Sequence, residues 1–143
     1  MKLLILSAFL TSCSVQEPIQ KLENIIKHEE KKGWTEYEAR VTYYWPNDGG
    51  QIGTQTSTGN KAAPNKTIAV DPKIIPYGSK VKIPAMETTF LAHDTGSWVK
   101  SRKASKAVGR NNIVIDVFCA DKADARQKIK KYPAFMKILV EDK

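Results

Sequence analysis

The chain has 143 residues, the size of a single domain, and its 41% hydrophobic and 27% charged residues are typical of a globular protein. This composition excludes a disordered, collagen-like or low-complexity chain. No apolar run approaches the ~20 residues of a membrane-spanning helix, and two cysteines are too few for a disulfide framework. The formal net charge of +8 predicts an anionic partner or surface.

The first residues have the pattern of an export signal. Lys2 is followed by a short apolar run that ends, at residues 10–13, in Leu-Thr-Ser-Cys, which resembles a bacterial lipobox. We therefore expect residues 1–12 to be a lipoprotein-type signal peptide that is removed, leaving Cys13 to carry lipid. An uncleaved anchor or a wrongly assigned start is the alternative.

An amphipathic helix is expected after Cys13. Between residue 17 and Gly33 the apolar residues recur at helical spacing on one face. These residues are Ile19, Leu22, Ile25 and Ile26. We interpret residues 13–36 as the lipidated cysteine with a helical spacer and residues 37–143 as the folded domain, although a docking helix would show the same pattern.

From residue 39 onward, short apolar runs alternate with turn residues, a rhythm typical of a small all-β sandwich or barrel. The expected strands are 39–45, 66–70, 80–83, 88–93, 113–119 and 135–140. One helix is expected over 121–131, where Pro133 stops it. Residues 46–64 and 95–112 are expected to be long loops, which in compact domains are usually functional or mobile.

Three aspartates end or interrupt apolar β runs. Asp71 and Asp94 come before turns, whereas Asp116 lies within a strand, on the same face as Val114 and Phe118. A carboxylate there is partly desolvated, so it finds donors or its pKa rises. A carboxyl group with a raised pKa can protonate the leaving oxygen of a glycosidic bond. Turn capping is the alternative; it is favoured for Asp71 but explains Asp116 poorly.

The blocks around these aspartates resemble the 3D domain family, which is named for three aspartates. The blocks are Thr56-Ser57-Thr58-Gly59, residues 67–81, Asp94-Thr95-Gly96 and Ile115-Asp116-Val117-Phe118. The family is related to the catalytic domain of membrane-bound lytic transglycosylase A and to rare-lipoprotein-A-like and expansin-like proteins. The resemblance covers about residues 37–131. It implies a mainly β fold, a six-stranded double-psi β-barrel, here with a peripheral helix and the N-terminal helical spacer.

The resemblance also implies site residues. Asp71, Asp94 and Asp116 match the three aspartates of the family, and Asp116 matches the catalytic acid of the transglycosylase. Asp116 and Asp94 are therefore the expected catalytic residues. The expected supporting residues are Asp71, Thr95, Gly96 and Lys100, and the expected substrate-binding residues are Thr58, Gly59 and Trp98. For Trp98, a sugar-stacking platform and simple packing are equally good explanations. No cofactor and no metal is expected.

The sequence departs from the family pattern at two places. Ser97 stands where the family has a second glycine. In the family, the third aspartate usually follows the lysine after a few residues, whereas here the basic stretch 101–112 lies between Lys100 and Asp116. Such an insertion at the mouth of the groove could reshape substrate binding or block it. Its cations could attract anionic wall polymer or lipid headgroups, or the segment could be a solvated loop.

We expect an enzyme that cleaves cell-wall (peptidoglycan) glycan, a lytic transglycosylase or O-glycosyl hydrolase with an aspartate general acid/base. The alternative is a non-catalytic peptidoglycan-binding, polysaccharide-binding or expansin-like envelope lipoprotein. Its expected partners are peptidoglycan or another envelope polysaccharide and, through the lipid anchor, a membrane. No nucleic acid partner is expected, and the protein is expected to be a monomer. The expected location is the cell envelope, on the periplasmic face of the outer membrane, or outside the cell.

Overall fold

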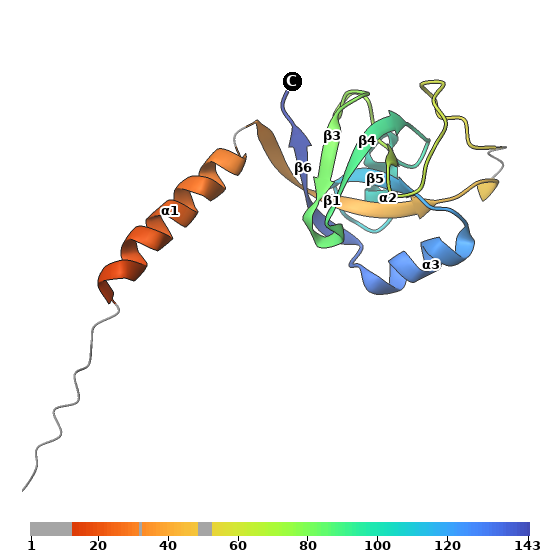
Figure 1. The fold of residues 1–143 in the computed structure, drawn as a ribbon. Coiled ribbons are helices and arrows are strands. Elements are labelled where there is room, and N and C mark those ends of the chain that lie inside the picture. Colours follow the sequence, from red (N-terminus) through yellow and green to blue (C-terminus); the bar gives the residue numbers. More distant parts are fainter. Residues whose placement is uncertain (1–12, 32, 49–52) are drawn as a thin grey trace, which may run out of the picture. The chain divides into compact units, whose positions relative to one another are not determined.

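A computed structural model describes residues 13–31, 33–48 and 53–143, so the predicted signal peptide lies outside the described residues (Figure 1). The contacts divide the chain into two compact units, Met1–Gly33 and Trp34–Lys143. In the first unit, α1 (Cys13–Lys31) is the expected helix, and its apolar residues Ile19, Leu22, Ile25 and Ile26 are exposed. In the described part of the chain, no helix is both long enough and apolar enough to cross a membrane.

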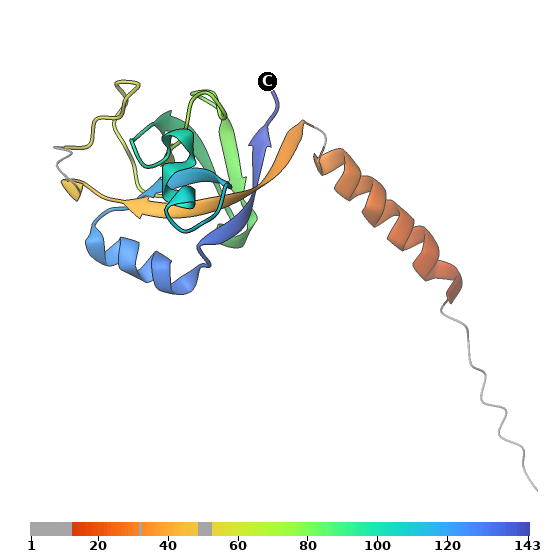
Figure 2. The same ribbon diagram turned by 180° about the vertical axis from the view of Figure 1, so that it is seen from behind.

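The second unit is a closed barrel of six strands in the order β1-β5-β2-β4-β3-β6, which confirms the predicted mainly β fold (Figures 1 and 2). The strands are β1 (Trp34–Tyr44), β2 (Thr67–Ala69), β3 (Lys80–Ile83), β4 (Thr88–Asp94), β5 (Ile113–Phe118) and β6 (Phe135–Glu141). The β1–β5 and β2–β4 pairs are parallel, and the other neighbouring pairs are antiparallel. Because the sheet closes on itself, the barrel has no free edge strand.

The helices around the barrel are short. They are η2 (Pro84–Met86), η3 (Lys100–Arg102), α2 (Lys103–Lys106) and α3 (Lys122–Lys131). The predicted helix at 121–131 is confirmed as α3, which packs beside β1. Asp121 caps α3 by accepting a hydrogen bond from the Asp124 N–H at 2.8 Å.

Two elements differ from the sequence prediction. β1 begins at Trp34 rather than at residue 39, because its first half pairs with β6 and its second half with β5. Its early residues are mostly exposed and show no apolar alternation, so periodicity did not reveal them. The predicted loop over 95–112 contains η3 and α2, which the run of basic residues and the absence of an apolar period concealed.

The barrel interior holds the hydrophobic core. Its buried side chains are Ala39, Val41, Ile68, Val70, Ile75, Val81, Ile83, Phe90, Ala92, Ile113, Ile115, Val117, Met136, Ile138 and Val140. Because side chains alternate along a strand, the intervening residues of β1 and β5 face outward. In this outer layer Thr42 lies opposite Asp116 and Tyr44 lies opposite Phe118.

Two segments cover this outer layer. The hairpin, residues 53–62, packs Ala62 against Tyr44 and Phe118. The basic segment, residues 95–112, packs Val99 and Ala104 against Val114 of β5, and its helical turns lie in front of β5 and β1 in Figure 2. Asp116 comes between Val114 and Phe118 on β5, so it lies between the two covering segments.

Candidate active site

Asp116 is a partly buried carboxyl group that β5 holds on the outside of the barrel, on the predicted face. Thr42 Oγ1 donates a hydrogen bond to Asp116 Oδ1 at 2.9 Å. Burial raises the pKa of Asp116 from about 3.8 to about 7; the Thr42 hydrogen bond opposes this rise, and the negative charges of Asp48 and Asp94 add to it. Near neutral pH, a large fraction of the molecules therefore carries a protonated Asp116.

Asp116 faces a cavity of about 340 Å³, a volume within the range of small-molecule sites. The other lining residues are Tyr44, Asp48, Ala69, Thr95, Gly96, Ser97, Trp98 and Val99. Trp98 is 55% exposed, which leaves much of its indole ring free. The Thr95 hydroxyl is buried and has no hydrogen-bond partner among the residues that the structure describes. The cavity therefore combines a proton donor, a flat aromatic surface and an unsatisfied hydroxyl group.

Asp94 is 1% exposed and does not line this cavity. Its carboxylate accepts four hydrogen bonds, two from the Ser57 N–H and hydroxyl at 2.9 and 2.7 Å, one from the Thr95 N–H at 2.9 Å and one from the Tyr44 hydroxyl at 2.8 Å. Burial and the Asp94 charge raise the pKa of Tyr44, so its hydroxyl remains a neutral donor. Asp94 thus fastens the hairpin and Tyr44 to the end of β4.

Asp71 is 8% exposed and fastens the basic segment. Its Oδ1 accepts a hydrogen bond from the Lys73 N–H at 3.1 Å, as expected of an aspartate that caps a turn, and its Oδ2 accepts one from the Ser101 N–H at 2.8 Å. Ser101 and Arg102 both have left-handed backbone conformations, with φ of 54° and 59°. The Asp71 carboxylate therefore stabilises a turn that these residues adopt only at a cost.

Residues 95–99 of the basic segment form a wall of the cavity, and the inserted residues 101–112 leave Asp116 accessible to it. The segment is held on the outside of the barrel by its apolar contact with Val114 and by Arg40, whose Nη1 donates to the Ala104 carbonyl at 2.9 Å. Lys103 Nζ lies 4.9 Å from the centre of the Trp98 ring. This cation–π contact favours the orientation in which Trp98 stands at the cavity mouth.

Other predicted site residues lie away from the cavity lining. Thr58 and Gly59 are exposed at the hairpin tip, where Gly59 has a φ of 82° and the Thr58 hydroxyl donates to the His93 carbonyl at 2.8 Å. Lys100 is exposed at the start of η3. The side chain of Cys13 lies outside the described residues. The structure thus brings Thr95, Gly96 and Trp98 to Asp116, and it places Thr58, Gly59 and Lys100 elsewhere.

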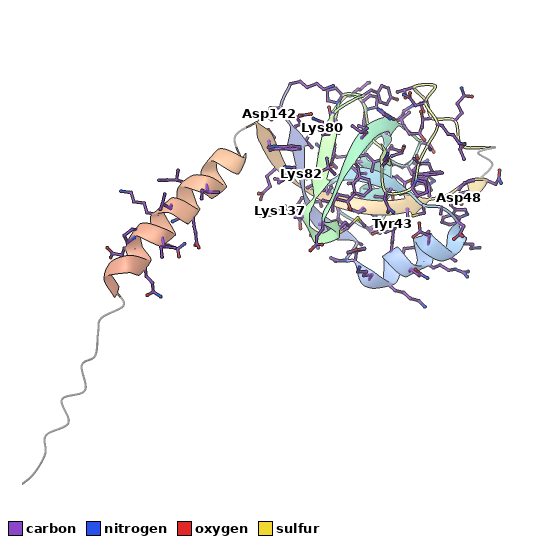
Figure 3. The ribbon with its side chains drawn as sticks, viewed as in Figure 1. Tyr43, Asp48, Lys80, Lys82, Lys137 and Asp142 are labelled. Carbon is purple, nitrogen blue, oxygen red and sulfur yellow. The ribbon has the colours of Figure 1, made fainter. Side chains whose placement is uncertain are left out.

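The sequence analysis missed two residues of the site. Thr42 reaches Asp116 only because β1 and β5 pair in parallel, a register that no local pattern indicates. Asp48, labelled in Figure 3, lies four residues after the end of β1 and lines the cavity, but in the sequence it is one acid in a polar loop. Among the described residues, no cluster of three or more His, Cys, Asp or Glu side chains could hold a metal ion.

The structure is a six-stranded barrel in which one aspartate faces a cavity and two others hold the covering loops in place. These features are those of a three-aspartate barrel protein. The 3D domain model matches residues 66–139, just over half of the chain. The chain belongs to the 3D domain family.

Two known proteins show the extent of the similarity. The cell wall-binding protein YocH of Bacillus subtilis is 42% identical over an alignment of 88 residues that covers 59% of this chain and 26% of YocH. The lytic transglycosylase LtgG of Burkholderia pseudomallei aligns with 62% of this chain and 25% of its own, at 21% identity and a TM-score of 0.34. The chain therefore spans about a quarter of the length of each of these proteins.

Proposed function

We propose that the barrel cleaves a glycosidic bond of cell-wall glycan, with Asp116 as the general acid. The observation that carries this proposal is a carboxyl group whose pKa is raised to about 7, in a cavity that it shares with the exposed Trp98. A general acid works best when its pKa lies near the operating pH. An indole ring offers a flat apolar face to a sugar ring.

The proposed reaction is that of a lytic transglycosylase, which the resemblance to the 3D family implies. Asp116 donates its proton to the leaving oxygen O4 as the bond between C1 and O4 breaks. The Asp116 carboxylate then accepts the proton of the C6 hydroxyl of the same sugar as O6 bonds to C1. The products are a 1,6-anhydro sugar and a new free 4-hydroxyl group, and Asp116 regains its proton. One catalytic carboxyl group suffices, because no external nucleophile takes part.

Hydrolysis is the second candidate reaction, and Asp48 favours it. Ordinary glycosidases use two carboxyl groups beside the bond, and Asp48 lines the same cavity as Asp116. With Asp48 as general base, a water molecule would attack C1 and the product would have a reducing end. Asp94 does not fit this role, because donors surround both of its oxygens. We propose Asp94 as a positioning residue that holds Tyr44 at the cavity wall.

Incubation of the full chain with isolated peptidoglycan, followed by mass spectrometry of the released fragments, tests both reactions. We expect 1,6-anhydro ends in the wild type, and a rate about 10²–10⁴-fold lower in Asp116→Asn. Asp121→Asn is the matched control, because asparagine caps a helix as well as aspartate does. Reducing ends that disappear in Asp48→Asn would instead indicate hydrolysis. Release of no fragments by the wild type would contradict both reactions.

A non-catalytic wall-binding module remains the competing function. It is favoured by the similarity to YocH, which is named as a cell wall-binding protein. The basic segment also favours it, since it carries five basic and no acidic residues. In this case, the wild type and Asp116→Asn would bind insoluble wall equally and neither would release fragments.

Both functions would place the protein in the cell envelope or outside the cell. We propose that residues 1–12 are removed, that Cys13 carries lipid, and that the spacer before the barrel ends at Gly33 rather than at residue 36, because residues 34–36 pair with β6. Labelling of cells with a fatty-acid analogue tests this proposal, because Cys13→Ser should abolish the label.

A further inference from the structure

The cavity at Asp116 is the first of three neighbouring cavities. A second cavity, of about 270 Å³, shares Asp48, Trp98 and Asp116 with the first and is also lined by Arg40. A third, of about 300 Å³, shares Arg40, Thr42 and Tyr43 with the second. We refer to these three neighbouring cavities together as the groove along β1; Arg40 and Asp116 line its middle cavity together. Tyr43 and Asp48, which both line the second cavity, are labelled in Figure 3.

Arg40 is the basic residue that lines the second and third cavities of this groove. A guanidinium group has five N–H donors. In Arg40, Nη1 donates to the Ala104 carbonyl, whereas Nε is buried and has no hydrogen-bond partner among the described residues. Within the described ranges, no carboxylate forms an ion pair with Arg40. A partly buried cation without a paired carboxylate is costly to the protein alone, and an anion in the cavity that Arg40 lines would offset this cost.

The surroundings of Arg40 also favour an anion. Ala104 and Ala107 of the basic segment form the groove wall beside Arg40. The five basic residues of that segment add positive potential there. Asp48 and Asp116 line the first and second cavities, whereas Arg40 lines the second and third. The charged groups therefore change along β1, from two carboxyl groups to a guanidinium group, and both kinds line the second cavity.

We propose that Arg40 forms a subsite for a carboxylate group that the glycan strand carries close to the bond placed at Asp116. This proposal rests on the proposed function for the position of the bond. Thr42 lies opposite Asp116, and Arg40 is two residues earlier in β1, which corresponds to about 7 Å along a strand. Such a spacing fits a carboxylate on an adjoining sugar, or on a peptide attached to it. The planar guanidinium group suits a carboxylate better than the single charge of a lysine does.

Binding of small ligands to the full chain tests the subsite without any cleavage. Four probes are compared by titration calorimetry: neutral diacetylchitobiose, N-acetylglucosaminyl-N-acetylmuramic acid with its free lactyl carboxylate, the same disaccharide bearing a dipeptide, and that glycopeptide with its carboxylates amidated. We expect at least one carboxylated probe to bind about tenfold or more tightly than both neutral probes. The second and third probes distinguish a sugar carboxylate from a peptide carboxylate. Equal affinities for all four would overturn the proposal.

Variants identify the residue that binds the carboxylate. In Arg40→Gln the preference for the carboxylated probe should disappear, Arg40→Lys should keep part of it, and Arg126→Gln should keep all of it, because Arg126 is exposed on α3 and lines none of the three cavities. A preference that survives in Arg40→Gln would overturn the assignment. Since Arg40 also holds Ala104, thermal unfolding of each variant is measured, and the probe series on the wild type is independent of variant folding.

The outcome is separable from that of the proposed function. A carboxylate preference without fragment release from peptidoglycan supports the subsite and contradicts catalysis. Fragment release without a preference for the carboxylated probes supports catalysis and contradicts the subsite. Inhibition of carboxylate binding by inorganic phosphate is expected to be weak, and phosphate that binds Arg40 more tightly than any carboxylated probe would overturn the proposal in favour of a phosphate ligand.

Discussion

The hairpin and the basic segment cover the same outer layer of the barrel, yet they are built differently. The hairpin forms its own backbone hydrogen bonds, including Thr56 N–H to the Asn60 carbonyl at 2.8 Å, and an antiparallel bridge between Gln55 and Lys61. The basic segment turns through two left-handed residues, Ser101 and Arg102, and contains only short helical turns. The basic segment also forms backbone hydrogen bonds of its own, including Ala107 N–H to the Lys103 carbonyl at 3.0 Å, so its left-handed turn is what distinguishes it from the hairpin.

A buried aspartate fastens each segment, and this shared device explains two of the three aspartates. Asp94 accepts two hydrogen bonds from Ser57 of the hairpin, and Asp71 accepts one from Ser101 of the basic segment. Asp116, between them, holds neither segment and faces the cavity. On this face of the barrel, Asp94 and Asp71 therefore have structural roles, and the third aspartate, Asp116, is the one that lines the cavity.

Asp94→Asn should have the largest effect on folding. Asparagine keeps an oxygen for the three donors at Oδ1 and places an NH₂ group opposite the Tyr44 hydroxyl, which can accept from it, but the negative charge is lost. A hydrogen bond to a charged group is worth about 1 kcal/mol more than a neutral one, so the four bonds together predict a loss of at least about 3 kcal/mol in the free energy of unfolding. Urea denaturation measures it. A loss below about 1 kcal/mol would mean that the hairpin is held mainly by its own hydrogen bonds.

Asp116→Asn should have the opposite effect on stability, and only at higher pH. The folded pKa, about 7, exceeds the unfolded value of about 3.8, so ionisation costs stability as the pH rises from about 4 to 7. At pH 8 the variant should be more stable than the wild type by up to about 4 kcal/mol, and below pH 4 the two should be alike. Urea denaturation at both pH values checks this. A stability difference that is independent of pH would contradict the raised pKa.

Asp71→Asn should lower the free energy of unfolding by less, about 1–3 kcal/mol, because the carboxylate accepts hydrogen bonds from only two backbone N–H groups. Its effect should also be local. Amide hydrogen exchange should accelerate at Ser101 and remain unchanged at Ser57, and Asp94→Asn should show the reverse pattern. Equal acceleration at both amides in either variant would mean that the two segments open together, and that the two aspartates do not act separately.

The sequence predicted those parts of the fold that depend on local patterns. The alternation around Asp116 predicted that it shares a face with Val114 and Phe118, and the segment 121–131 that ends before Pro133 was predicted as the helix α3. The sequence did not predict the fastening of Ser57 by Asp94 or of Ser101 by Asp71, because these hydrogen bonds join residues 37 and 30 positions apart. For the same reason the sequence did not predict Thr42, which lies on the parallel neighbouring strand β1 and donates a hydrogen bond to Asp116. Long-range pairing is set by barrel closure, which no short stretch of sequence encodes.

The smallest expected effect is a shift in the pH dependence of the cleavage rate, and it concerns Asp116. A general acid must be protonated, so the cleavage rate of the wild type should fall as the pH rises through about 7. The Thr42 hydrogen bond stabilises the ionised form of Asp116, so Thr42→Val, which keeps the side-chain shape, should raise its pKa. Asp48→Asn removes a nearby negative charge and should lower it.

The two substitutions should therefore move the midpoint of the falling limb in opposite directions, each by up to about one pH unit. The ¹³C chemical shift of the Asp116 carboxyl group, titrated in the absence of substrate, measures the same pKa independently of activity. Val in place of Thr42 should then leave a larger protonated fraction at pH 8 and a higher rate than the wild type. If the carboxyl titrations shift as predicted while the rate profiles do not, a group other than Asp116 donates the proton.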